Sequence, residues 1–195
     1  MNEAQVLASF RKAGALLDGH FVYASGRHGR QFLQAARVLQ YPELAERLCA
    51  AIADRFLEAE VDLVVGPATG GIILAYETAR HLKCRAAFTE KESDGTMALR
   101  RGFLLNRRER VLVVEDIATT GGSVKKSMAH LRERGAVIVG VSVLIDRSAG
   151  EVAFDCRYEP LARLSMQSWE PSACELCQAG HRLIDPDDIV LSPQS

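Results

Sequence analysis

The sequence has 195 residues, of which 48% are hydrophobic and 25% are charged, and its formal net charge is -1. This composition is typical of a single soluble globular domain, and the nearly neutral charge argues against nucleic acid and anionic membranes as partners. No apolar run approaches the roughly 20 residues of a membrane helix, and MNEAQVLASFRKAGALLDG lacks the basic start and apolar core of a signal peptide. Five mostly scattered cysteines fit a reducing cytoplasm better than a disulfide framework, so we expect a cytoplasmic protein.

The N-terminal part of the chain predicts two helices separated by two strands. Apolar residues recur with helical spacing over residues 3–17. Residues 20–37 alternate short apolar stretches with a Gly-rich basic turn, which predicts two short strands and a loop. Pro42 suits the first turn of a helix, and helical periodicity follows over residues 43–60.

The middle of the chain predicts two strands around one helix. DLVVG, residues 62–66, has the character of a short buried strand, residues 70–83 have helical periodicity, and RAAFT, residues 85–89, predicts the next strand. Residues 90–101, EKESDGTMALRR, are mostly polar and have no clear strand or helix pattern, so we expect a loop there.

The remaining elements complete an alternation of strands and helices. VLVVE predicts a strand, residues 124–134 a helix that Gly135 ends, and residues 136–146 a long strand. After Gly150 the pattern weakens to a strand near residues 161–166 and an irregular tail. This order predicts an α/β fold with a mainly parallel sheet covered on both faces, whose ligands bind beyond the carboxyl ends of the strands.

The stretch VLVVEDIATTGGS, residues 111–123, joins an apolar strand to acids, hydroxyls and glycines. Glycines let the backbone approach a ligand, amides at a helix start attract an anion, and hydroxyls add donors. Residues 119–123 therefore predict a phosphate cradle, which is neither a Walker loop nor a G-x-G-x-x-G turn. Glu115 and Asp116 precede it, and carboxylates beside a phosphate need another partner, such as sugar hydroxyls or substrate-bound Mg²⁺. The pattern favours a ligand like ribose 5-phosphate over a simple tight connection.

These thirteen residues resemble the signature of the type I phosphoribosyltransferase family, whose members bind 5-phosphoribosyl 1-pyrophosphate (PRPP). The resemblance implies that the two acids hold the ribose hydroxyls and that the loop holds the 5-phosphate. The implied PRPP-binding residues are Glu115, Asp116, Ile117, Ala118, Thr119, Thr120, Gly121, Gly122 and Ser123.

Three further stretches are similar to the orotate-using branch of that family: SGRHGRQFLQAAR (25–37), GPATGGI (66–72) and LIDRS (144–148). The first implies an N-terminal hood over the pyrimidine base, with Phe32 against the base. The third implies that Arg147, together with Thr119, binds orotate. The second implies a pyrophosphate loop made of Ala68, Thr69, Gly70 and Gly71.

Physical arguments support these roles independently. Orotate is a planar carboxylate, and a guanidinium such as that of Arg147 suits a bidentate carboxylate contact, although a surface pair with Asp146 is the alternative. Phe32 could stack on a flat base or could be a core residue of the hood. The glycines at positions 70 and 71 follow a strand and would let backbone amides approach pyrophosphate.

The mobile loop departs from the best-known bacterial pattern, R-K-E-x-K-x-H-G. In the corresponding stretch, residues 90–101, only Lys91-Glu92 matches. Two further departures lie elsewhere: Ala24 replaces the family's lysine before SGR, and Gly70 replaces its lysine in the pyrophosphate loop. Lys91 joins Glu115 and Asp116 as a candidate catalytic residue. Arg100 and Arg101 are further loop cations, and the alternative for Lys91 and both arginines is a solvated charged loop.

The resemblance implies the type I phosphoribosyltransferase fold, with a hood mainly in residues 1–40, a core in about 41–165 and a tail in about 166–195. The implied reaction transfers the phosphoribosyl group of PRPP to orotate, with Mg²⁺ bound mainly through PRPP, under a closing lid at residues 90–101. The family also implies a homodimer with shared active sites. The alternatives are a purine phosphoribosyltransferase, which should lack the hood and Arg147, and a PRPP-sensing regulator, which would need a DNA-binding domain or a basic face.

The C-terminal stretch PSACELCQAGH contains Cys174-x-x-Cys177 followed by His181. Two cysteines and a histidine at this spacing could bind zinc, with Cys156 as a possible fourth ligand. A redox pair and two ordinary cysteines are the other interpretations. A single C-x-x-C is a weak signal, so we assign no metal ligand from the sequence.

Overall fold

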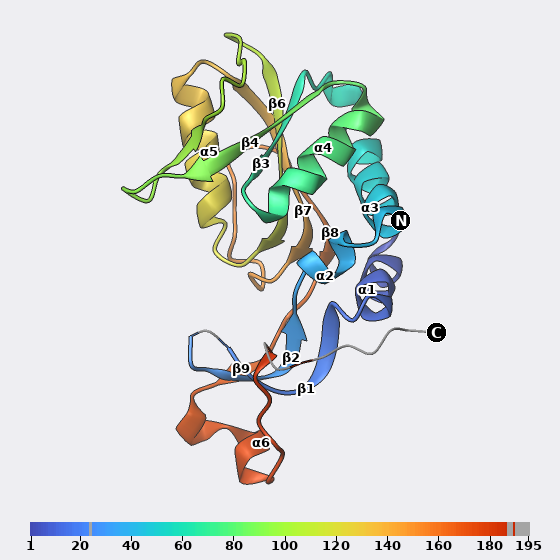
Figure 1. Cartoon of the computed structure of the whole chain (residues 1–195), viewed down its shortest axis with the longest axis vertical. Coiled ribbons are helices and arrows are strands. Elements are labelled where there is room, and N and C mark those ends of the chain that lie inside the picture. The colour runs from blue at the N-terminus through green and yellow to red at the C-terminus, as the bar shows by residue number, and fades with distance from the viewer. Residues whose placement is uncertain (24, 187–188, 190–195) are drawn as a thin grey trace.

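Two β-sheets organise the chain, and a computed structural model describes residues 1–23, 25–186 and 189 of it. One sheet has six strands in the order β5-β4-β3-β6-β7-β8, and the other has three in the order β1-β2-β9. The three-stranded sheet lies apart from the six-stranded one, at the opposite end of the molecule (Figure 1). Ala24, which stands in place of a family lysine, lies outside the described residues.

The six-stranded sheet is parallel except at one edge. Its strands are β3 (Leu63–Pro67), β4 (Arg85–Lys91), β5 (Met97–Leu99), β6 (Arg110–Ala118), β7 (Val137–Asp146) and β8 (Tyr158–Arg163). Neighbours from β4 to β8 pair in parallel, and only β5 runs antiparallel, beside β4. The predicted α/β fold with a mainly parallel sheet is confirmed.

Helices cover both faces of this sheet, as its apolar strands require. In Figure 1, α3 (Pro42–Arg55) and α4 (Gly70–Leu82) lie on one face and α5 (Gly122–Glu133) on the other. Alternate residues of β6 divide between the two cores: Leu112 and Val114 join the cluster with α3 and α4, and Val111 and Val113 join the cluster with α5. All four side chains are fully buried. This packing fixes the end of β6, where the acids lie.

The three-stranded sheet joins the two ends of the chain. It contains β1 (Leu16–Val22), β2 (His28–Leu33) and β9 (Ser168–Trp169), all antiparallel, after the first helix α1 (Glu3–Lys12). The short helix α2 (Ala36–Leu39) leads from β2 to α3, and α6 (Glu175–Gln178) follows β9. Beyond α6 the chain returns to β1, where the Ile184 amide donates to the His20 carbonyl at 2.8 Å.

Several predicted boundaries differ from the structure. The helix expected over residues 3–17 ends at Lys12, because Gly14 takes a left-handed conformation, with φ of 62°, and Leu16 already pairs with Leu33. The helix expected over residues 43–60 ends at Arg55, and a 3-10 turn, Leu57–Ala59, follows. The strand expected near residues 161–166 begins earlier, as β8.

The polar stretch at residues 90–101 is a hairpin, where the sequence had suggested a loop. Strand β4 continues to Lys91, and β5 pairs back onto it with Lys91 opposite Met97. The Glu92 amide donates to the Thr96 carbonyl at 2.9 Å, and Gly95 supplies the positive φ that the turn needs. Met97 and Leu99 are buried, and this burial favours a strand in a stretch whose other residues are polar.

Among the described residues, no helix combines the length and the apolar character that a membrane span requires.

Candidate active site

Glu115 and Asp116 occupy the carboxyl-terminal part of β6, in the centre of the sheet. Glu115 is only 9% exposed. The Asp116 amide donates to Glu115 Oε1 at 3.1 Å, and the Ile117 amide donates to Asp116 Oδ1 at 2.7 Å. Within the described part of the chain, neither carboxylate forms an ion pair.

Burial raises the pKa of both acids of this pair, and the neighbouring charge adds to the effect on Glu115. Removal from water, followed by the neighbouring Asp116 charge, raises the pKa of Glu115 to about 8. Burial also raises the pKa of Asp116. Two buried acids of this kind favour a ligand that donates hydrogen bonds, and vicinal sugar hydroxyls do so.

The turn after β6 has the geometry of an anion cradle. Thr119 and Thr120 are exposed, and Gly121 takes a φ of 69°, which a side chain at that position rarely adopts. A Cβ on Gly121 would also lie 3.0 Å from the ring of Phe154. Helix α5 begins at Gly122, so the first amides of the helix lack intrahelical partners, an arrangement that suits anion binding.

A cavity of about 330 Å³ lies in front of this turn. Its walls come from the acid strand, the cradle, the β4–β5 hairpin and α5, and include Glu115, Ile117, Thr119, Thr120, Gly121, Gly122, Ser123, Lys91 and Lys126. Lys126 was not singled out from the sequence. It follows Gly122 by four residues, so helical periodicity places both on the cradle side of α5. Its Nζ donates to the Gly95 carbonyl at 2.6 Å, which connects α5 to the hairpin tip.

The loop arginines are engaged elsewhere. Arg100 pairs with Glu92, and Arg101 pairs with Glu90 at 2.8 Å. Neither arginine lines the cavity, whereas Lys91 does. Of the three loop cations that the sequence offered, the structure therefore brings Lys91 to the cradle.

The loop between β3 and α4 packs closely against β6. A Cβ on Gly66 would lie 2.0 Å from the Gly71 carbonyl oxygen, so this contact excludes a side chain. A Cβ on Gly70 would lie 2.3 Å from Asp116 Oδ2. The Ala68–Thr69 peptide bond between these glycines is cis. The absence of a side chain at position 70 thus leaves room for the second acid.

A second cavity, of about 530 Å³, separates the three-stranded sheet from the end of β7. It is lined by Val22, Tyr23, Ser25, Phe32, Leu33, Gln34, Arg147, Asp185 and Pro186. The Arg147 amide donates to the Ala118 carbonyl at 2.8 Å, and Ala118 pairs with Asp146 in the sheet. The two cavities therefore open beside adjacent strand ends, one after β6 and one after β7.

Arg147 is the chemically informative residue of the second cavity. Its Nε is buried and has no hydrogen-bond partner within the described residues. Burial raises the pKa of the neighbouring Tyr23 phenol, and the positive charge of Arg147 lowers that pKa in part. A buried guanidinium nitrogen without a partner is costly, and a carboxylate ligand would satisfy it.

The remaining predicted residues of the second cavity lie as follows. Phe32 lines the wall and contacts Phe21, with ring centroids 5.8 Å apart, and the Arg37 guanidinium lies 5.5 Å from its ring. Thr119, which the resemblance linked to orotate, lines the first cavity. Tyr23, Gln34 and Asp185 were not singled out from the sequence. Gln34 lies within the stretch 25–37, whose resemblance pointed to Phe32, and Tyr23 and Asp185 lie outside the stretches that carry the resemblance.

Comparison with known proteins agrees with this geometry. Residues 34–158 match the model of the phosphoribosyl transferase domain family. The orotate phosphoribosyltransferase of Caldicellulosiruptor saccharolyticus is 45% identical over 186 residues, which cover 95% of this chain and 97% of the relative. That of Acidithiobacillus ferrooxidans is 46% identical and covers 98% and 100% of the two chains. The crystal structure of orotate phosphoribosyltransferase from Aeropyrum pernix superposes with a TM-score of 0.66 at 31% identity, over 82% of this chain and 93% of the other.

Proposed function

The chain belongs to the phosphoribosyltransferase family, in the branch of its orotate-using relatives, and we propose that it transfers the 5-phosphoribosyl group of PRPP to orotate. The N1–C1′ bond forms as the bond between C1′ and the pyrophosphate oxygen breaks, and the proton leaves N1. The products are orotidine 5′-monophosphate and pyrophosphate, which makes this a step of de novo pyrimidine biosynthesis.

The strongest support for orotate as the substrate is the Arg147 Nε, which has no partner among the described residues and lies beside the phosphate cradle. Orotate carries a carboxylate that a guanidinium binds through two hydrogen bonds, whereas adenine and hypoxanthine carry none. Phe32 offers its ring to the flat base on the same cavity wall. A purine would leave the Arg147 nitrogen unsatisfied.

The first cavity suits PRPP. The cradle amides and hydroxyls at residues 119–123 hold the 5-phosphate, and this remote binding energy positions C1′. Glu115 and Asp116 accept hydrogen bonds from the ribose hydroxyls and stabilise the positive charge that develops on the sugar. The backbone of residues 68–71 faces the pyrophosphate.

Stabilisation of the leaving pyrophosphate is the main catalytic requirement. Mg²⁺ is bound mainly through PRPP and neutralises part of the pyrophosphate charge when present. Neither acid forms an ion pair within the described residues, so both are available to a ligand that brings its own metal. Lys91 supplies a cation from the chain itself, and the β4–β5 hairpin that carries it closes over the reacting centre and excludes water.

An exposed apolar surface on α3 and α4 supports a homodimer. Ile73 is 47% exposed and Tyr76 is 69% exposed, and both line a cavity of about 650 Å³ that Glu46 and Arg80 also line. Such patches on small proteins commonly bind a partner. We expect sedimentation to give twice the chain mass for the wild type and the monomer mass for Tyr76→Arg. A monomeric wild type would exclude the shared sites.

A cytoplasmic location suits five free cysteines.

The direct test measures absorbance loss of orotate with PRPP and Mg²⁺, beside the same reaction with adenine or hypoxanthine. Asp116→Ala removes a ribose ligand and should lower turnover by about 100-fold or more. Asp155→Ala is the matched control, because Asp155 is an exposed acid paired with Arg132, and it should retain full activity. Turnover of a purine in place of orotate would contradict the role given to Arg147.

A further inference from the structure

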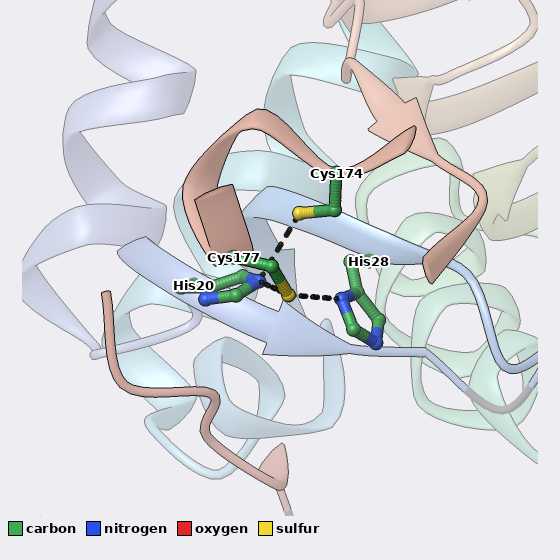
Figure 2. A group of neighbouring side chains, drawn as sticks. All are labelled: His20, His28, Cys174 and Cys177. Carbon is green, nitrogen blue, oxygen red and sulfur yellow. Dashed lines mark hydrogen bonds between the residues drawn. The ribbon is translucent and has the colours of Figure 1, made fainter. Parts of the chain in front are cut away.

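Four side chains outside both cavities converge within the three-stranded sheet and the tail. They are His20 on β1, His28 on β2, Cys174 at the start of α6 and Cys177 within it. One nitrogen or sulfur atom from each lies within 4.8 Å of all the others. Figure 2 shows the two imidazole rings and the two sulfur atoms pointing toward one another. His20, His28 and Cys174 are buried.

The spacing of these atoms fits a tetrahedral metal site. Zinc binds sulfur at about 2.3 Å and imidazole nitrogen at about 2.0–2.1 Å, so ligand atoms at the corners of a tetrahedron lie about 3.3–3.8 Å apart. Here Cys174 Sγ lies 3.3 Å from His20 Nε2, and Cys177 Sγ lies 3.7 Å from the same nitrogen. Cys177 Sγ lies 3.3 Å from His28 Nδ1. Bound zinc requires little movement of these groups.

The hydrogen bond of His20 orients the imidazole so that its Nε2 can bind a metal ion. Its Nδ1 lies 2.9 Å from the His181 carbonyl oxygen. A carbonyl can only accept, so Nδ1 carries the hydrogen and Nε2 presents its lone pair to the sulfur atoms. A backbone carbonyl that orients an imidazole in this way is a regular feature of zinc sites.

Two other interpretations of the cysteines account for less of the geometry. A redox pair needs only Cys174 and Cys177 and leaves the convergence of two histidines unexplained. Two ordinary cysteines would not require histidines from β1 and β2, which are separated from the cysteines by about 150 residues of chain. Cys156, the fourth ligand considered from the sequence, instead packs against the core beside α5, and His181 contributes its carbonyl rather than its ring.

We propose that His20, His28, Cys174 and Cys177 bind one structural Zn²⁺ ion. Two thiolates neutralise the charge of the ion, and two neutral imidazoles complete a closed four-coordinate site without an open position for substrate. Binding releases the two thiol protons to solvent. The ion joins the N-terminal hairpin to the C-terminal tail and takes no part in phosphoribosyl transfer.

The position of this site gives it influence over the second cavity. The hairpin segment between His20 and His28 carries Tyr23 to the cavity wall. The tail beyond His181 returns to β1 through Ile184 and places Asp185 on the same wall. Loss of zinc would therefore loosen two segments that border the base, and the phosphate cradle on β6 and α5 would stay intact.

The first experiment determines metal content in the full-length chain, purified without a metal-binding tag and under reductant. We expect about one zinc per chain by inductively coupled plasma mass spectrometry. Replacement of the zinc by Co²⁺ should give the visible absorption of a tetrahedral site together with sulfur-to-cobalt charge transfer. A wild-type protein that holds neither metal after incubation with excess Zn²⁺ or Co²⁺, or that contains a Cys174–Cys177 disulfide under these conditions, would overturn the proposal.

Variants then identify the ligands. Cys177→Ser and His28→Ala should each lower the zinc content well below one per chain, and Cys177→Ser should also lose the charge-transfer band of a two-sulfur site. Cys156→Ser and His181→Gln are matched controls that should keep one zinc per chain, because neither side chain belongs to the cluster. Zinc loss in the controls with retention in Cys177→Ser would assign the metal to other residues. The cobalt spectrum of the wild type decides the question even where a ligand variant fails to fold.

Discussion

The contact between Gly70 and Asp116 makes a single methyl group a sharp test of the active site. In Gly70→Ala the new Cβ would lie 2.3 Å from Asp116 Oδ2 and 2.6 Å from its Cγ. Real contacts of this kind are at least 3.0 Å, so the carboxylate must move by about 0.7 Å or more. A displacement of this size at a positioning group costs about 100-fold in rate. We expect kcat/KM for PRPP to fall by about that factor, which is about 2.7 kcal/mol of transition-state stabilisation.

The same change should leave the fold intact. Gly70 begins α4 and has no positive φ, so alanine is compatible with its backbone. Replacing glycine by alanine at such a site stabilises a protein by about 0.4–1 kcal/mol through the unfolded state, which offsets part of the steric strain. Thermal unfolding of the variant should therefore stay close to that of the wild type, and the loss of rate cannot be attributed to unfolding.

A double-mutant cycle isolates the contact. Asp116→Ala removes the atoms that the methyl group would strike, so Gly70→Ala should change the residual rate of that variant less than twofold. Rates come from absorbance loss of orotate at saturating orotate and varied PRPP. An equal effect of Gly70→Ala in both backgrounds, or wild-type activity of the single variant, would refute the steric argument.

Two further predictions concern the charged groups of the cavities. Burial raises the pKa of Glu115 from 4.5 in the unfolded chain to about 8 in the folded protein. The contribution of Glu115 to stability is therefore complete below pH 4.5 and is lost as the pH rises through about 8. The Tm of the ligand-free wild type should fall relative to that of Glu115→Gln between about pH 5 and about pH 9, and an equal pH dependence of the two Tm values would contradict the pKa shift. Arg147→Lys replaces a planar fork by a point charge, so the KM for orotate should rise roughly 10-fold to 100-fold while the KM for PRPP stays constant. Steady-state kinetics with both substrates varied would show the opposite pattern if Arg147 served the phosphate side.

The sequence predicted the central sheet and its acid strand because both depend on short-range pattern. Strands buried on both faces need continuous apolar runs, and VLVV and VIVGVSVLI have them. The turn at residues 119–123 was predictable for a similar reason, since its hydroxyls, glycines and helix start are consecutive. The place of Arg147 at the edge of the sheet was predictable because it directly follows an apolar strand.

Other features depend on contacts between distant segments and have no local signal. The strand β5 owes its form to the burial of Met97 and Leu99 in an otherwise polar stretch. Lys126 is one of several charged residues on α5, and only the position of the β4–β5 hairpin makes it part of the site. The histidines that join Cys174 and Cys177 come from β1 and β2, so spacing near the cysteines pointed to His181 instead.

The pairing of β2 with β9 also orders events during protein synthesis. Arg27 contacts Ser168, which is made 141 residues later. At typical translation rates the N-terminal hairpin therefore waits about 7–30 s for its third strand, and an isolated two-stranded hairpin is marginally stable in water. The wall that faces the base is completed after every strand of the larger sheet has left the ribosome. A chain released early, before the tail emerges, would carry a finished phosphate cradle and an open hood, and such fragments are natural substrates for chaperones and proteases.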